Sequence, residues 1–402
     1  MMAESEKPIS VVIAGAGYAG LHIALRLGSW LERHPEVTVT LVDKNDYHQV
    51  LTELPRVAAG LREQEAVRVT YDSVLSPRVV FRRTALTGFD LPRRHVLTND
   101  GPLPYDWLVL ALGSRPNDFS IPGLAERVLY LWSVDDAQRV WEAVNVAVDT
   151  AAGIDDDAER RRLLTLVIGG GGATGIELAG AFAEELPQLA RQRGLPPDLP
   201  QVVVVEAGPT ILAGSSSELI RRANELLAQL GVRVCINSMI AEAIPSGFRL
   251  KNGEIVSGGV FIWAGGVKAP EITVGSGLVV GHNGRIKVDK YLCALDHPHI
   301  FVAGDLASVV DPENGRVLPP LAQIALEEGN SVVHNLIASI EGRDLEPFRF
   351  ANKGFVVSVG GRRGVADIAG RTVGGRMAHL LKDSIEWEYR QSVKHLRGWS
   401  AV

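Results

Sequence analysis

The sequence predicts an α/β fold made of two Rossmann-like domains, followed by a small C-terminal α+β domain. A short apolar strand runs into a glycine-rich turn and a helix over residues 9–34, and the same order returns over residues 163–192. From about residue 346 the pattern changes, and alternating apolar residues predict an antiparallel hairpin. A chain of 402 residues is long enough for two or three such domains.

The first unit begins with ISVVIA at residues 9–14, which predicts a buried parallel strand. The turn GAGYAG follows and places Gly15, Gly17 and Gly20 in the spacing GxGxxG. In such a turn the first glycine permits a tight bend, the second admits a pyrophosphate, and the third lets helix and strand pack closely. The next strand ends at Asp43, 23 residues after Gly20, where an acid can accept hydrogen bonds from ribose.

The second unit repeats this order around the stretch GGGGATGIE. LLTLVIGG at residues 163–170 predicts the strand, Gly170, Gly172 and Gly175 give the spacing, and QVVVVE ends at Glu206. A proline-rich loop delays this acid to 31 residues after Gly175. One glycine turn is a weak signal, because any tight strand–helix connection can need glycine. Two complete units predict two dinucleotide sites.

Two dinucleotide sites predict one tightly bound dinucleotide and one that exchanges, namely FAD and NADH. We assign FAD to the first unit because more of the chain returns to it. The returning segment FVAGDLA carries Asp305, a candidate for binding the ribityl chain, although a strand-end aspartate can also cap the next helix. Glu206 is followed by Ala-Gly-Pro without arginine, which predicts NADH over NADPH because a carboxylate repels a 2′-phosphate.

With these residues identified, the chain from about residue 9 to about 375 resembles the type II (non-proton-pumping) NADH dehydrogenases. The resemblance rests on an ordered set of segments: DYHQVLTELPRVAAG (46–60), YDWLVLALGSRPNDFSIPG (105–123), FIWAGGVKAP (261–270), GRIKVDKYL, FVAGDLA and PPLAQIALEEGN (319–330). It implies that NADH reduces FAD and that reduced FAD reduces a quinone to quinol. It also implies an NADH domain inserted in the FAD domain, and a C-terminal domain for dimerisation and membrane contact.

The glycine turns and the resemblance together give a set of candidate cofactor residues. For FAD they are Gly15, Gly17, Gly20, Asp43, Lys44, Gly113, Asp305 and Ala322. For NADH they are Gly170, Gly172, Gly175, Glu206 and Gly265.

Three residues are candidates for the chemistry. By resemblance, Glu177 lies near the reactive face of the flavin and could relay a proton, although acids also favour the first turn of any helix. Gln323, in Ala-Gln-x-Ala, matches a residue that lines the flavin and quinone site. Lys353 resembles a family residue near that pocket, with a solvated turn lysine as the alternative. Glu327 stands where the family usually has glutamine, and a carboxylate cannot donate to a quinone carbonyl unless it is protonated.

We predict an FAD-binding domain from residues 1–130 and 284–340, an NADH-binding domain from 131–283, and a C-terminal dimerisation and membrane-contact region from 341–402. The charged stretch 149–162 predicts an exposed connection. GRIKVDKYL and HIFVAGD (299–305) are expected to form a strand pair.

The tail from Arg376 predicts an amphipathic helix. Its apolar stripe is formed by Met377, Leu381, Ile385, Tyr389, Val393 and Leu396. From Arg371 onward six basic residues face three acidic ones, and a basic amphipathic helix with Trp387 and Trp399 can lie on an anionic bilayer. Packing on its own domain or across a dimer is the alternative, and we favour such docking over membrane contact.

Composition limits other classes of function. The net charge of −6 argues against a general nucleic-acid binder. Cys235 and Cys293 form no metal or redox motif, so we predict no metal site and two inert thiols. No run approaches the roughly 18 apolar residues that span a membrane, and the N-terminus lacks a signal-peptide pattern. We expect a cytoplasmic homodimer with at most weak peripheral contact to the inner face of the cell membrane.

The leading prediction is an FAD-dependent NADH:quinone oxidoreductase. A soluble NADH-dependent reductase of a small iron–sulfur electron carrier shares both dinucleotide sites, and its turnover should depend on salt. A disulfide-, peroxide- or sulfide-converting flavoenzyme would need a cysteine beside the flavin. A flavoprotein that senses redox state would form long-lived complexes with NADH.

Overall fold

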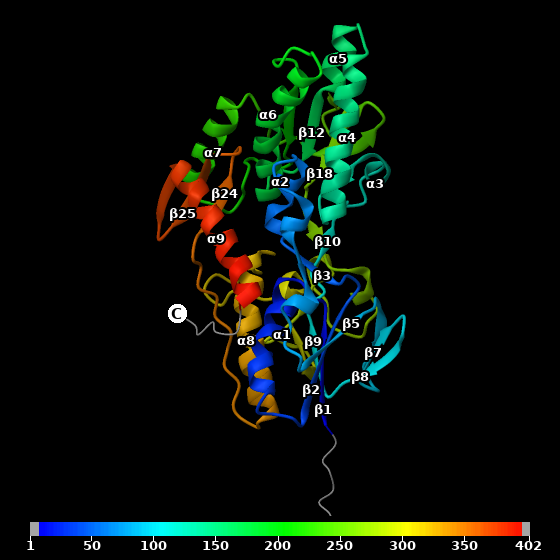
Figure 1. Cartoon of the computed structure of the whole chain (residues 1–402), viewed down its shortest axis with the longest axis vertical. Helices are drawn as coiled ribbons and strands as arrows, with labels where there is room; N and C mark the ends of the chain where they lie inside the picture. Colours follow the sequence, from blue (N-terminus) through cyan, green and yellow to red (C-terminus); the bar gives the residue numbers. More distant parts are fainter. Residues whose placement is uncertain (1–7, 396–402) are drawn as a thin grey trace, which may run out of the picture.

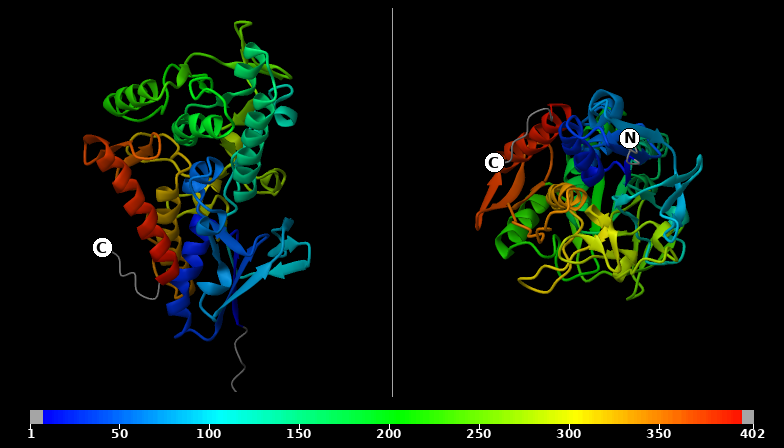
Figure 2. Two further views of the ribbon diagram at one scale, coloured as in Figure 1. Left: turned by 45° about the horizontal axis from the view of Figure 1, so that its top comes forward. Right: turned by 90° about the horizontal axis from the view of Figure 1, so that it is seen from below.

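The computed structural model describes residues 8–395. Two α/β lobes are stacked along the long axis of the molecule, and the C-terminal helix α9 runs along their side (Figure 1). The two further views show α9 beside α8 of the first lobe, with the C-terminal strands reaching toward the second lobe (Figure 2).

The first lobe is built on a six-stranded sheet. Its strand order is β21 (Cys293–Ala294), β22 (His297–Val302), β9 (Trp107–Leu110), β1 (Ile9–Ala14), β2 (Val37–Asp43) and β5 (Val79–Arg83). All pairs are parallel except that of β21 with β22. Helices α1 (Tyr18–Leu31) and α8 (Ala322–Ile340) pack against each other over this sheet. Residues 11–14 of β1 are buried, as expected for a strand covered on both faces.

The second lobe repeats this plan with a five-stranded parallel sheet. Its order is β11 (Leu129–Tyr130), β18 (Val260–Trp263), β12 (Thr165–Gly169), β13 (Gln201–Val205) and β14 (Arg233–Cys235). Its helices are α3 (Leu124–Arg127), α4 (Val134–Ala152), α5 (Asp157–Leu163), α6 (Ala173–Gln192) and α7 (Ser217–Gln229).

The chain crosses between the lobes at two short strands. β10 (Arg115–Pro116) and β19 (Val267–Lys268) pair antiparallel, so the whole second sheet lies between two parts of the first lobe in sequence. The predicted fold class, with the second domain inserted in the first, is therefore confirmed. Ala269 and Leu278 pack in the core of the first lobe. The predicted domain limits at residues 130 and 283 stay a prediction.

One segment of the first lobe contributes to the core of the second. It contains β3 (Tyr47–Gln49), which pairs with β4 (Arg68–Thr70), and α2 (Leu54–Ala58), which packs on α4 and α6. Val50, Leu54 and Val57 share a core with Val134 and Ile176. This shared core ties the lobes together, and the local sequence pattern did not predict it.

Four smaller sheets complete the lobes. They are β6 (Leu86–Asp90), β7 (His95–Thr98) and β8 (Gly101–Pro104); β15 (Ile240–Ile244), β16 (Gly247–Leu250) and β17 (Ile255–Ser257); the pair β20 (Ile286–Lys287) and β23 (Ala307–Ser308); and β24 (Phe355–Ser358), β25 (Gly364–Ile368) and β26 (Arg371–Gly375). The last sheet and α9 (Arg376–His395) confirm the predicted C-terminal α+β domain.

Helix α9 docks on its own chain, one of the two docking modes predicted. Val393 and Tyr389 of the predicted stripe pack inward, but other positions of the stripe do not. Met377 and Ile385 of the predicted stripe are 73% and 47% exposed, whereas Lys382 and Glu386 are buried. The stripe is wrong at these positions because α2 and α6 present charged partners to α9. Leu396 lies outside the described residues.

The stretch 149–162 is exposed or half-buried except at Ala151, as predicted. It is largely helical, because the Asp156 carboxylate accepts from the N–H groups of Ala158 and Glu159 at 2.8 and 3.0 Å and caps α5. One other sequence prediction needs correction. The expected pairing of GRIKVDKYL with β22 is wrong: β20 pairs with β23, and β21 alone of that region pairs with β22.

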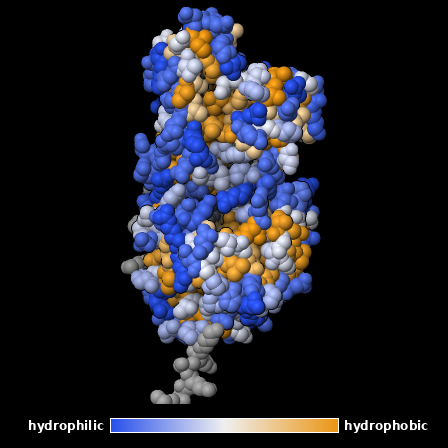
Figure 3. All heavy atoms as spheres, turned by 90° about the vertical axis from the view of Figure 1, so that its right-hand side faces the viewer, coloured by the Kyte–Doolittle hydropathy of each residue, from blue (hydrophilic) through white to orange (hydrophobic). Residues whose placement is uncertain are grey.

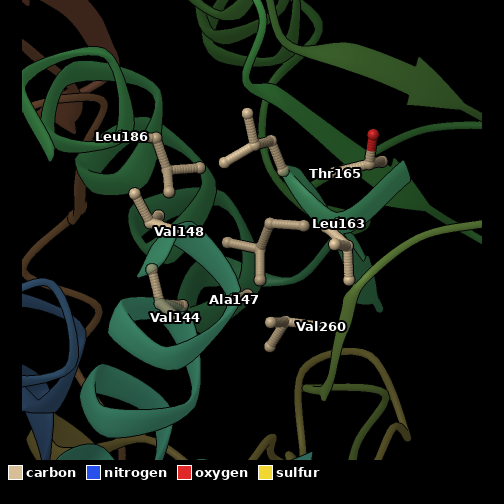
Figure 4. A pocket seen from close by; sticks show the side chains of 9 residues that line it. Val144, Ala147, Val148, Leu163, Thr165, Leu186 and Val260 are labelled. Atoms are coloured by element: carbon tan, nitrogen blue, oxygen red, sulfur yellow. The ribbon is translucent and has the colours of Figure 1, made fainter. Parts of the chain in front are cut away.

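One void in the second lobe is enclosed by α4, α6 and the start of β12 (Figure 4). Its lining is apolar apart from Thr165, and its volume of about 10 Å³ is close to the least that one water molecule needs. The void therefore offers no room for a cofactor. Within residues 8–395 there is no helix long and apolar enough to cross a membrane. On the face shown in Figure 3, hydrophilic side chains separate apolar patches on the two lobes.

Candidate functional site

The first glycine turn joins β1 to α1. Gly15 has φ of +97°, and a Cβ there would lie 2.4 Å from the carbonyl oxygen of Ala111. A Cβ on Gly20 would lie 1.8 Å from the carbonyl oxygen of Gly15. A Cβ on Gly17 would meet nothing within 4 Å. Gly15 and Gly20 are therefore required by the protein's own packing, whereas Gly17 leaves open space over the turn, as a pyrophosphate needs.

Asp43 closes the other side of this turn. Its carboxylate accepts from the N–H groups of Ala16 at 2.8 Å and Asn45 at 2.9 Å. Burial raises the pKa of Asp43, and these two N–H groups oppose the rise. Lys44 follows directly and is exposed. The carboxylate is thus held at the edge of the turn, where a ribose would bind.

The second glycine turn has the same construction. Gly170 has φ of +116°, and a Cβ there would lie 2.3 Å from the carbonyl oxygen of Ala264. A Cβ on Gly175 would lie 2.0 Å from the carbonyl oxygen of Gly170, and a Cβ on Gly172 would meet nothing within 4 Å. Glu206 occupies the position of Asp43 and accepts from the N–H groups of Gly171 at 2.7 Å and Gly208 at 2.6 Å.

The helices after the two turns begin without a side-chain cap. Gly17 and Gly172 are the N-cap residues of α1 and α6, and neither offers a hydrogen-bonding side chain. By contrast, α4, α5 and α7 are capped by Ser133, Asp156 and Ser216. The free N–H groups of α1 and α6 are suited to phosphate. Both turns therefore fit a dinucleotide.

Segments from distant parts of the chain converge on the first turn. Gly113, with φ of +65°, follows β9, and the next residue, Ser114, donates its hydroxyl to Asp305 at 2.6 Å. Asp305 lies in the turn after β22, and burial raises its pKa against the effect of this hydrogen bond. Its hydrogen-bond partner among the described residues is a hydroxyl rather than a helix N–H, which disfavours the helix-cap alternative. Ala322 is the first residue of α8, which begins without a side-chain cap.

Glu328 of α8 belongs to this group and was missed from the sequence. It is fully buried, accepts from the N–H of Gly304 at 2.5 Å, and leaves its Oε1 without a hydrogen bond among the described residues. Burial raises its pKa to about 8, with Asp305 adding to the rise and Arg285 opposing it. The only signal in the sequence was the Glu-Glu pair at 327–328.

The second turn is covered by the end of β18. A Cβ on Gly265 would lie 2.3 Å from the Trp263 ring, so this glycine is needed for the indole to pack. The indole N–H is bonded to the carbonyl of Asn117 at 2.8 Å. Beyond Glu206 an open hollow of about 470 Å³ is lined by Ala207, Asn237, Ser238, Met239, Leu250, Lys251 and Asn252. Its size is in the range of ligand sites, and its lining begins at the residue after Glu206.

Glu177 lies in α6 beyond its first turn, so the helix-dipole alternative does not explain it. Its side chain is 10% exposed and accepts from the N–H of Ser358 in β24 at 3.0 Å. It also forms an ion pair with Lys382 of α9. Lys382 was missed from the sequence, because the two residues are 205 positions apart and nothing local connects them.

Gln323 and Lys353 form a second group. With its amide oxygen facing a donor, Gln323 accepts from the N–H of Lys353 at 2.8 Å and donates to the carbonyl of Gly354 at 3.3 Å. The Lys353 ammonium lies 2.8 Å from Glu327, although its side chain is 66% exposed. The acid that departs from the family pattern thus has a cation partner. No hydrogen bond or ion pair between described residues joins this group to Glu177; β24 leads from one to the other.

Helix α9 also contacts the aromatic residues beside the first turn. Tyr389 donates to or accepts from His48 at 2.8 Å, and His48 in turn lies 3.4 Å from the carbonyl of Ala16. Tyr18 packs against both rings. Burial lowers the pKa of His48 to about 4, so its imidazole is neutral near pH 7. The C-terminal helix therefore contacts the surroundings of both glycine turns.

The two cysteines are not placed for redox chemistry with each other. Cys235 lies in β14 of the second sheet, and Cys293 lies in β21 of the first. Burial raises the pKa of Cys293 to about 12, which disfavours the thiolate that such chemistry needs.

Known proteins are similar to this chain in sequence and in fold. Residues 9–329 match the family "Pyridine nucleotide-disulphide oxidoreductase". A type II NADH:quinone oxidoreductase of Staphylococcus aureus is 31% identical over 391 residues, which cover 96% of this chain and 95% of that protein. A relative with the same name in Staphylococcus haemolyticus is also 31% identical, with the same shares.

Solved structures show the same fold at lower identity. The structure of NDH2 from Plasmodium falciparum in complex with NADH has a TM-score of 0.86 at 17% identity, over 96% of each chain. The sulfide:quinone oxidoreductase of Aquifex aeolicus has a TM-score of 0.79 at 19% identity, over 96% of this chain and 91% of that one. The chain belongs to the pyridine nucleotide-disulphide oxidoreductase family and, within it, to the type II NADH:quinone oxidoreductases.

Proposed function

We propose that this protein is an FAD-dependent NADH:quinone oxidoreductase, with FAD at the first glycine turn and NADH at the second. The observation that carries the proposal is that the two glycine turns have the same backbone structure but different surroundings. Segments around Ser114, Asp305 and Glu328 close over the first turn, which favours a retained cofactor. Next to the acid of the second turn, from Ala207 onward, lies the open 470 Å³ hollow, which favours exchange.

The cofactor residues have distinct tasks in this proposal. Gly17 and Gly172 leave room for pyrophosphate, and the uncapped ends of α1 and α6 offer it N–H groups. Asp43 and Glu206 are held by backbone N–H groups so that their carboxylates can accept from ribose hydroxyls. Glu206 would also repel a 2′-phosphate, which selects NADH over NADPH. FAD, when bound, supplies the chemistry of accepting two electrons from NADH and passing them to the quinone.

Glu177, Gln323 and Lys353 would serve the quinone end of the reaction. The Glu177–Lys382 pair is buried and can hold a proton that a quinone oxygen needs on reduction. Gln323 and Lys353 are oriented by their mutual contacts, and the Glu327 carboxylate is engaged by the Lys353 ammonium at 2.8 Å. Gln323 rather than Glu327 would then be the donor to a quinone carbonyl.

Anaerobic stopped-flow spectroscopy tests this function. The FAD-loaded protein is reduced with NADH or NADPH while flavin absorbance is followed, and is then mixed with a soluble menaquinone or ubiquinone analogue. We expect fast bleaching by NADH, slow bleaching by NADPH, and fast reoxidation by the quinone. Fast bleaching with slow reoxidation by quinone would reject the quinone assignment. It would favour the reductase of a small iron–sulfur carrier, whose turnover falls with rising salt.

We also propose that the outward face of α9 makes a peripheral contact with the inner face of the cell membrane or with a second copy of the chain. Met377, Leu380, Ile385 and Trp387 are 73%, 62%, 47% and 59% exposed on this helix. Sedimentation with anionic vesicles and analytical ultracentrifugation distinguish the two contacts. A monomer that stays in the supernatant would reject both.

A further inference from the structure

The inward face of α9 forms a buried charge cluster with α2 and α6. Lys382 and Glu386 are 6% and 5% exposed. The Lys382 ammonium pairs with Glu177 and lies 3.4 Å from Glu386. Arg56 of α2 lies 3.5 Å from Glu386 and 2.6 Å from Asp383. Lys382 thus lies between Glu386 and Glu177 in space and contacts both carboxylates.

Among the acids of this cluster, Glu386 has the weakest hydrogen bonding and ion pairing to offset the burial of its charge. Neither of its carboxylate oxygens takes part in a hydrogen bond among the described residues. Its two cation contacts, at 3.4 and 3.5 Å, are longer than the 2.7–2.9 Å typical of a charge-assisted hydrogen bond. A buried carboxylate without good partners favours its neutral form. Burial raises the pKa of Glu386 to about 7, Glu177 and Glu53 add to the rise, and Lys382 and Arg56 oppose it.

The charged and titratable groups around Glu386 come from five elements. They are Tyr18 of α1, Glu53 and Arg56 of η1 (Leu51–Glu53) and α2, Glu177 of α6, and His379, Lys382, Asp383 and Arg390 of α9 itself. Glu53 pairs with Arg62 and Arg390, and Asp383 pairs with Arg56 and His379. These acids have near partners of their own, so Glu386 is the carboxyl that can gain or lose a proton without breaking a close ion pair.

This inference rests on the reaction given under "Proposed function". That reaction needs a group that takes up a proton and releases it again in each turnover. NADH, one proton and a quinone give NAD⁺ and quinol. The hydride of NADH supplies both electrons and one proton, so a second proton must come from the medium for each turnover.

We propose that Glu386 holds this second proton and supplies it, through Lys382, to Glu177 and the quinone. Glu386 gives its proton to the Lys382–Glu177 pair, which passes one proton to a quinone oxygen, and solvent then reprotonates Glu386. No electron passes through these side chains. Because Glu386 acts through Lys382, it is a positioning residue for proton supply rather than a group that touches substrate.

The pH profile of Glu386→Gln tests this role. Turnover of the FAD-loaded full chain is measured from pH 5.5 to 8.5 with a soluble quinone, and with ferricyanide, which accepts electrons without protons. We expect quinone turnover to fall by about tenfold or more and to lose its titration near pH 7, with ferricyanide turnover unchanged. Glu386→Asp keeps a carboxyl and should keep the titration. Glu388→Gln, at an exposed position of the same helix, is the matched control and should keep the wild-type profile.

A merely structural role for Glu386 gives different results. An unchanged quinone profile in Glu386→Gln, or equal losses with quinone and ferricyanide, would overturn the inference while wild-type quinone turnover upholds the proposed function. Wild-type protein that reduces ferricyanide but not quinone would overturn the proposed function and this inference together. Flavin content and circular dichroism of each variant show whether α9 and the fold are retained.

Discussion

The two glycine turns of this protein are nearly equivalent in backbone structure. The N–H groups of Gly15 and Gly170 each donate to a carbonyl near the end of a neighbouring strand, that of Val42 in β2 or Val205 in β13, at 2.8 Å. The N–H groups of Ala111 and Ala264, after the third strand of each unit, bond back to Ala14 and Gly169 at 2.8 and 2.7 Å. Each turn thus sits in the same three-strand frame.

The turns differ in what surrounds them. Around the first turn lie Asp305 and Glu328 from the far end of the chain and, through His48, Tyr389 of α9. Around the second lie the end of β18 and an open hollow. The residue two positions after the last glycine also differs: His22 is bonded to Asn330 of α8 at 2.7 Å, whereas Glu177 pairs with Lys382 of α9. The same backbone motif is therefore compatible with a retained cofactor or an exchanging one, and the cover distinguishes them.

The largest effect should come from adding a methyl group at the third glycine of each turn. In Gly20→Ala and Gly175→Ala the new Cβ would lie 1.8 or 2.0 Å from a backbone carbonyl oxygen, so strand and helix must separate. We expect a loss of roughly 3 kcal/mol or more in unfolding free energy for each. Gly20→Ala should also lose FAD, while folded Gly175→Ala should keep FAD and lose reduction by NADH. Flavin absorbance per protein and urea titration measure both.

Gly17→Ala is the matched control for these variants, since a Cβ there meets nothing within 4 Å of the protein. It should keep wild-type stability in the absence of cofactor. Equal destabilisation by Gly17→Ala and Gly20→Ala would contradict the division of roles between the glycines.

The next effect is the pH dependence of the unfolding free energy that comes from Glu328, which lies beside the first turn. Its pKa is raised from 4.5 to about 8, so the folded protein keeps a proton that the unfolded chain releases. The stability contributed by Glu328 is fully present below pH 4.5 and is lost as the pH rises through about 8. Glu328→Gln should reduce this loss of unfolding free energy by on the order of a few kcal/mol. Urea midpoints at pH 6 and pH 9 measure it, and an equal fall in wild type and variant would reject the assignment.

A smaller effect is expected from Glu177→Gln on the second turn's helix. Removing its charge leaves Lys382 without its closest partner and removes a proton carrier. Quinone turnover should fall about 10²-fold, with NADH binding retained. Glu185→Gln, on the same helix and hydrogen-bonded to Gln188, is the matched control and should stay close to wild type. Steady-state kinetics with a soluble quinone test this, and equal losses in both variants would count against Glu177.

The smallest effect concerns the acid at the edge of the second turn. In Glu206→Ala the carboxylate that would repel a 2′-phosphate is gone, so the preference for NADH over NADPH should fall about tenfold, or roughly 1.4 kcal/mol. The ratio of kcat/KM for the two nucleotides measures this change. FAD content should stay unchanged, and its loss would mean that the two turns are not independent.

Much of the fold was predictable because its signals are local. A glycine turn needs particular residues at nearby positions, since a Cβ at Gly20 or Gly175 would clash with the carbonyl oxygen of Gly15 or Gly170, five residues earlier in the same turn. The apolar runs of β1 and β12 and the acids Asp43 and Glu206 follow at short range. These patterns were sufficient for two Rossmann-like units, their order, and the C-terminal α+β domain.

The tertiary structure alone decided which distant residues meet. The burial of Lys382 and Glu386 depends on charged partners from α2 and α6, so the hydrophobic pattern of α9 indicated the wrong face at Met377 and Ile385. Glu328 became notable only because the turn at Gly304 folds against it. A charge is tolerated in the interior only where a partner is brought to it, and that partner can lie 205 residues away in the chain.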